Sequence, residues 1–184
     1  KVSIKSQTKV VFPNNEVTDM FYTYQDIAVK DREERQNYDC ILKRGVSVLV
    51  LDSRLEIRPD YIKSFKYTIT GNCGNVFNPS TGHCLEKTTL TKTYDISGNQ
   101  YKGKKIMFSS YFFLGEDNVT DITLATQSVD TENNVAKELS FENVHMVKGK
   151  MTTYKGPFLS THSAASFIID SPTIPDSGFS TEFE

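Results

Sequence analysis

The 184-residue sequence contains no tryptophan and only three cysteines, and no apolar run approaches the roughly 20 residues that a membrane-spanning helix needs. The longest apolar runs, VSVLVL and SSYFFL, have the length of β-strands. The formal net charge is −2, and acidic and basic residues are interspersed along the chain. Because nucleic-acid-binding proteins carry a concentrated basic surface, we predict no nucleic-acid partner.

Motifs of enzymes and metal sites are also missing. The sequence has no nucleophile elbow, P-loop or dinucleotide-binding glycine motif. The histidines His83, His145 and His162 lack the spacing of zinc ligands, and the loop GEDNVTD (115–121) lacks the alternation of a calcium-binding loop. We therefore predict a protein without enzymatic activity, cofactor or metal.

The odd number of cysteines leaves two questions open. Cys73 and Cys84 bracket a turn-rich segment, GNVFNPSTGH, so two neighbouring antiparallel strands could bring them within disulfide distance. We predict this bridge, which would contribute roughly 3 kcal/mol in an oxidising compartment. The alternative is a pair of free thiols. Cys40 lies among apolar neighbours in YDCILKR and is predicted to be a small buried core residue.

Apolar residues recur with a period of two, which is typical of β-strands, and no segment reads as a long amphipathic helix. The segment YDCILKRGVSVLVLDS is apolar at both parities near its end, so it predicts a central strand buried on both faces. Clusters of turn residues separate the candidates at regular intervals. The predicted strands cover residues 2–12, 19–30, 38–53, 62–70, 84–96, 104–114, 121–129, 137–147, 150–159 and 163–170.

Many short strands without helical crossovers predict an all-β protein, an antiparallel β-sandwich of two sheets with Greek-key connections. No linker divides the chain, so we predict one domain over residues 1–170. Residues 171–184, SPTIPDSGFSTEFE, contain prolines and widely spaced apolar residues. We predict that they form a C-terminal tail.

The stretch NVHMVKGKMTTYKGPFLS alternates, is interrupted at Lys148-Gly149-Lys150, and then resumes. We interpret it as two successive strands joined where Gly149 permits a bend, with both lysines in water. Gly156-Pro157 ends the second strand, since proline cannot donate a hydrogen bond to a sheet.

Two stretches of the chain resemble the N-terminal domain of Bacteroidetes fimbrillins and of their anchor or accessory subunits. The first combines a Leu-Lys-Arg and alternating-valine strand with a later Phe-Asn and Thr-Gly turn, at Leu42, Lys43, Arg44, Val46, Val48, Phe77, Asn78, Thr81 and Gly82. The second places family-pattern residues at Asn143, Val144, Lys148, Thr152, Gly156, Phe158 and Leu159. Two positions depart from the pattern, because Gly149 stands where Asn is usual and Met151 where Arg is usual.

This resemblance implies a transthyretin-like sandwich that is exported as a lipoprotein, reaches the outer membrane through a removed N-terminal lipid anchor, and acts at the cell surface in a fimbrium. The implied work is adhesion or pilus assembly with other fimbrial subunits, another copy, or a host protein or glycan. Family members assemble by exchanging a terminal strand. The candidate exchanged or docking residues are Val2, Ile4 and Val10 near one end and Ile174, Phe179 and Phe183 near the other. Family members usually have two sandwich domains, whereas this chain has room for one.

Two other functions fit the same strand pattern. Nine tyrosines and twelve phenylalanines could supply stacking surfaces for a carbohydrate-binding sandwich, although tryptophan is absent. A closed barrel that binds a small apolar ligand is the second alternative.

Overall fold

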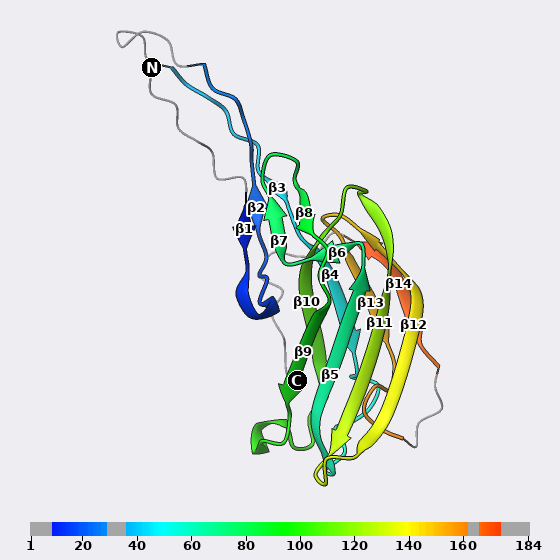
Figure 1. The fold of residues 1–184 in the computed structure, drawn as a ribbon. Coiled ribbons are helices and arrows are strands. Elements are labelled where there is room, and N and C mark those ends of the chain that lie inside the picture. The colour runs from blue at the N-terminus through cyan, green and yellow to red at the C-terminus, as the bar shows by residue number, and fades with distance from the viewer. Residues whose placement is uncertain (1–8, 29–35, 162–165, 174–184) are drawn as a thin grey trace.

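The computed structural model describes residues 9–28, 36–161 and 166–173, and these residues form an all-β, sandwich-like structure, as the sequence predicts (Figure 1). The helices among the described residues are two single 3-10 turns, Pro13–Asn15 and Asn99–Tyr101. None of the helices in this part of the chain has the length and apolar character needed to cross a bilayer.

One layer is a five-stranded sheet in the order β14-β13-β4-β10-β6, with bounds Ile168–Thr173, Met151–Lys155, Ser47–Asp52, Met107–Leu114 and Cys73–Gly74. All six residues of the middle strand β4 are buried, which confirms the prediction of a central strand. Strand β13 pairs with β4 in parallel, so this sheet is not purely antiparallel as predicted. The chain reaches β13 from β12 of the opposite sheet, so β13 and β4 are not joined by a hairpin, the connection that would require antiparallel pairing.

The facing layer is a four-stranded antiparallel sheet in the order β12-β11-β5-β9, with bounds Val135–Val147, Val119–Asp130, Ile62–Gly71 and Leu90–Asp95. Phe65, Tyr67 and Ile69 of β5 are buried, as their shared parity predicts. The ring of Phe65 stacks on that of Phe108 in β10, with centroids 4.2 Å apart. This contact between the two layers lies within the main core, whose aromatic members each contribute up to about 3 kcal/mol by leaving water.

A smaller sheet lies beside the sandwich and consists of β1 (Val10–Val11), β7 (Val76–Asn78) and β8 (His83–Glu86). A second buried cluster joins it to the main sheets through Val17, Val46, Phe77 and Phe113. The remaining strands, β2 (Phe21–Tyr22) and β3 (Lys43–Arg44), form a two-stranded ribbon of their own.

The tight turn at Lys148-Gly149-Lys150 joins β12 to β13, which confirms the interpretation of this stretch as two strands. Gly149 has φ +72°, a conformation that glycine adopts without strain. The turn carries the chain from the four-stranded sheet to the five-stranded one. Lys148 is partly buried and contacts Tyr22, so the prediction that both lysines lie in water is wrong for Lys148.

Several predicted strands are shorter than expected. The described part of the predicted strand 19–30, residues 19–28, contains only the two-residue β2, and 38–53 contain β3 and β4 separated by a break. Residues 84–96 divide into β8 and β9, because the Thr88 amide leaves the strand direction to donate to the carbonyl of Cys73. Strand β14 continues to Thr173, so the predicted boundary between domain and tail at residue 170 falls inside a strand.

Candidate functional site

A two-limbed arm projects from one end of the sandwich (Figure 1). We define the arm as residues 20–28 and 36–44, whose limbs begin at the β2–β3 pair. Farther out, the side chain of Gln25 donates a hydrogen bond to the carbonyl oxygen of Asp39 at 2.8 Å, and the Tyr38 hydroxyl donates to the carbonyl oxygen of Ala28 at 3.0 Å. These bonds tie the two limbs together beyond the sheet that supports them.

The arm exposes large apolar side chains to water. Ile41 is 75% exposed and Leu42 62% exposed. The other exposed large hydrophobic residues of the arm are Phe21, Tyr24, Ile27 and Tyr38. Single exposed apolar residues are ordinary on protein surfaces, but a group of this size on one projecting element is typical of an interaction surface.

Aromatic and ionic contacts fix the base of the arm to the body. Tyr22 packs its ring edge-on against buried Phe77, with centroids 4.9 Å apart. The Arg44 guanidinium lies 3.2 Å from a carboxylate oxygen of Asp19 and 4.9 Å from the ring centroid of Phe21. The arm therefore begins from the second buried cluster rather than from a free loop.

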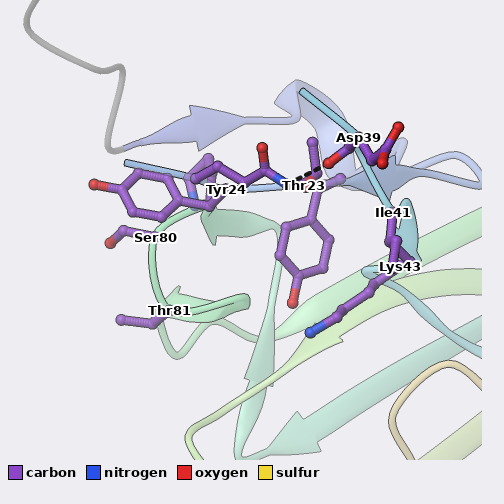
Figure 2. Close-up of a pocket in the computed structure, with 10 residues that line it drawn as sticks. Thr23, Tyr24, Asp39, Ile41, Lys43, Ser80 and Thr81 are labelled. Carbon is purple, nitrogen blue, oxygen red and sulfur yellow. Dashed lines mark hydrogen bonds between the residues drawn. The ribbon is translucent and has the colours of Figure 1, made fainter. Parts of the chain in front are cut away.

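A hollow of about 380 Å³, here called the arm hollow, lies between the arm and the turn that follows β7 (Figure 2). Tyr24, Ile41 and Lys43 reach it from the two limbs, and Ser80 and Thr81 face it from the turn. Its lining combines exposed apolar groups, hydroxyl groups, the Gln25 amide, the Asp39 carboxylate and one lysine.

A second hollow of about 410 Å³, here called the basic hollow, adjoins the first and shares three lining residues with it. Its lining residues are Tyr22, Lys43, Arg44, Thr81, Asn118 and Lys148. The Lys148 ammonium nitrogen lies 3.3 Å from the Tyr22 hydroxyl oxygen and 5.5 Å from the ring centroid. Burial lowers the pKa of Lys148, and the nearby charge of Lys43 lowers it further.

A family model described as "Family of unknown function (DUF6562)" matches residues 1–182. The chain belongs to the DUF6562 family. Comparisons with curated proteins and with solved structures find no match. The family description mentions no fimbrial protein, so the likeness to fimbrillins stays a prediction from the quoted motifs.

In this DUF6562 protein, the two motif stretches named above meet at the basic hollow. Lys43, Arg44 and Thr81 come from the first stretch and Lys148 from the second. Leu42 lies on the exposed face of the arm. The motif residues buried in the body are Val46, Val48, Phe77, Val144, Thr152, Gly156, Phe158 and Leu159.

Two further motif positions have backbone roles. Asn143 has φ +57° and lies beside an irregularity in the β11–β12 register. Gly82 has φ +74°, and a side chain at this position would collide with the Tyr22 hydroxyl. Of the predicted docking residues, Val10 lies in β1, opposite Phe77. Val2, Ile4, Ile174, Phe179 and Phe183 lie outside the described residues.

The three cysteines are free thiols in the structure, which does not contain the predicted Cys73–Cys84 bridge. Burial raises the pKa of the Cys73 thiol to about 12, and Cys84 is near enough to raise it as well. Cys84 donates to the Glu86 carbonyl oxygen at 2.9 Å. The bridge stays a prediction for an oxidised sample. Cys40 is exposed on the arm, so its predicted place in the core is wrong: no second layer covers this part of the arm.

Metal-binding clusters of three or more His, Cys, Asp or Glu side chains do not occur among the residues that the structure describes. His145 lies 3.1 Å from a carboxylate oxygen of Asp121, on the surface of the β11–β12 pair. His83 is partly buried in β8, and His162 lies outside the described residues.

Sequence reasoning missed the arm, because apolar alternation over 19–30 and 38–53 suggested core strands. The charged run DREERQ between these segments is the signal that could have identified it. A charged run between two apolar segments is unlike the turns that connect core strands, and it predicts that the flanking segments lie near the surface.

Proposed function

We propose that this chain is a non-enzymatic, fimbrillin-like assembly subunit of the cell surface that binds a second copy of itself through the arm. The observation that carries the proposal is the group of exposed large apolar side chains on the arm. Adhesion or pilus assembly at the outer membrane is the setting that the motif resemblance implies.

The area available on the arm is enough to matter energetically. Full burial of a large apolar side chain contributes about 1.5–3 kcal/mol, and the six side chains of the arm are 43–75% exposed. Covering all six therefore contributes roughly 5–10 kcal/mol. Association costs about 4–15 kcal/mol in lost freedom of motion, so a stable complex also needs polar contacts near the arm.

The sheet edges support the predicted strand exchange. Among the described residues, β1 pairs only with β7, and β14 pairs only with β13. Each strand nearest a chain end is therefore an edge strand, with one side of its backbone unpaired. An edge strand is held by half the hydrogen bonds of a central strand and can pair with another chain.

The test is sedimentation velocity over a range of protein concentrations. The variant Ile41→Ser/Leu42→Ser removes the two most exposed aliphatic groups of the arm. The matched control, Leu55→Ser/Ile57→Ser, changes two similarly exposed residues in the loop that follows β4. We expect the wild type and the control to associate with rising concentration and the arm variant to remain monomeric. Monomeric wild type, or equal association of all three proteins, would overturn the proposal.

Of the alternatives, the closed barrel does not fit the structure, because the described sheets have open strand orders. One observation favours the carbohydrate-binding alternative, namely that Tyr24 is 43% exposed beside the hydroxyl groups of Ser80 and Thr81 in the arm hollow. A glycan array tests it, and loss of a bound sugar on Tyr24→Ala with retention on Tyr38→Ala would support it.

A further inference from the structure

We infer that the basic hollow binds a carboxylate group of an acidic peptide segment on the protein partner. This inference rests on the proposed function and deepens it by naming the chemistry of the partner. Its evidence is the arrangement of charge at the base of the arm.

Positive charge converges in the basic hollow without an acidic residue in the lining. Lys43, Arg44 and Lys148 supply three cations, and the other three lining residues are uncharged. Asp19 is the carboxylate nearest to Arg44 and pairs with that residue. Neither Lys43 nor Lys148 forms an ion pair within the described part of the chain.

The fold holds these cations in place. The Lys148 amide donates to the Asn118 carbonyl oxygen at 2.8 Å, which anchors the turn between β12 and β13. The side chain of Lys148 is partly buried, and its only described polar contact is the uncharged hydroxyl of Tyr22. A partly buried charge without a counter-charge is costly, and an incoming anion would remove that cost.

Neutral donors complete the arrangement. Thr81 and Asn118 are exposed at the rim of the same hollow. A hydroxyl group and a side-chain amide can each donate to a carboxylate oxygen while the lysines supply charge. The lining thus combines charged and neutral donors for one small anion.

A peptide fits the surroundings better than a sugar acid. The basic hollow continues into the arm hollow, where Ile41 is exposed, so one extended segment can place an acidic side chain and an apolar side chain together. The nearest aromatic ring, that of Tyr22, is engaged by Phe77 and Lys148. It is therefore poorly placed to stack on a sugar.

The experiment measures binding of a fluorescent tetra-glutamate peptide to the whole chain at low ionic strength, with tetra-glutamine as the uncharged probe. We expect the chain to bind tetra-glutamate and not tetra-glutamine. Lys43→Gln or Lys148→Gln should each weaken the binding of tetra-glutamate about tenfold, the loss expected when one hydrogen bond between charged groups is removed. The control Lys104→Gln/Lys105→Gln makes the same change of charge at two exposed lysines elsewhere. It should bind as the wild type does.

Melting temperatures verify that the variants fold, and we expect no decrease, because each change removes an unpaired cation. Equal weakening in the control, or no weakening in Lys43→Gln/Lys148→Gln, would overturn the inference. Binding of a uronate oligosaccharide without binding of tetra-glutamate would also overturn it, in favour of a glycan. Peptide binding requires no self-association, so this inference and the proposed function can fail separately.

Discussion

Replacement of Glu56 by glutamine should destabilise the fold, because the Glu56 carboxylate accepts three hydrogen bonds that join two loops. Glu56 is partly buried in the loop after β4, and its oxygens accept hydrogen bonds from the amides of Leu159 and Ser160 at 2.7 and 2.9 Å. The Ser53 hydroxyl donates a third bond at 2.7 Å. One carboxylate thus joins the loops that follow β4 and β13.

The magnitude follows from these three bonds. A hydrogen bond to a charged group contributes about 1.5–3 kcal/mol. Glutamine keeps one carbonyl acceptor, loses the charge, and turns an NH₂ group toward a backbone donor. We expect Glu56→Gln to lower the free energy of unfolding by about 2–4 kcal/mol, a large part of the 5–15 kcal/mol typical of a domain.

Urea denaturation at pH 7, followed by circular dichroism, measures this effect. At a typical slope of about 2 kcal/mol/M, the midpoint should fall by about 1–2 M with the slope unchanged. Glu142→Gln makes the same change at an exposed residue of β12 and should shift the midpoint very little. If Glu56→Gln and Glu142→Gln shift it equally, the bridging role assigned to Glu56 is wrong.

Three further predictions concern single sites in the body. Gly82→Ala should lower the free energy of unfolding by about 1–3 kcal/mol, since φ is +74° and a neighbouring tyrosine hydroxyl occupies the side-chain position; chemical denaturation measures it. Under oxidising conditions Cys73 and Cys84 should form the predicted bridge, and a mass spectrum of the peptides without the loss of two hydrogens would contradict this. Burial opposes ionisation of Asp52, but hydrogen bonds from Arg54 outweigh it and lower its pKa. That stability is present above the unfolded pKa of about 3.9 and is lost as the pH falls through the folded value, so Asp52→Asn should flatten the acid limb of a stability curve measured below about pH 4.

The sequence predicts the strands of the sandwich correctly where the apolar pattern of a strand matches the faces that the strand buries. Phe65, Tyr67 and Ile69 share a parity and a buried face, because β5 packs one side against the opposite sheet. Val48 to Leu51 are apolar at both parities because β4 is buried on both sides. In these segments the local pattern and the packed environment agree.

The arm and the basic hollow could not be predicted in the same way. Alternation in 19–30 resembles that of a core strand, and only the tertiary structure shows that Phe21, Tyr24 and Ile27 in its described part are exposed. Lys43 and Lys148 line the same hollow because of the sheets that their segments enter. The turn at Gly149, which has a positive φ, takes the chain from one sheet to the other. The parallel pairing of β13 with β4 depends on the same crossing and leaves no local signal.

The most direct measurement of the proposed role is photocrosslinking from the arm itself. A photoreactive phenylalanine analogue at position 41, in place of Ile41, should produce a covalent dimer on irradiation, with linked peptides that include the arm. The same analogue in place of Leu55 should leave the chain monomeric. Dimers formed from position 55 but not from position 41, or from neither position at concentrations where the chain associates, would contradict a role for the arm in assembly.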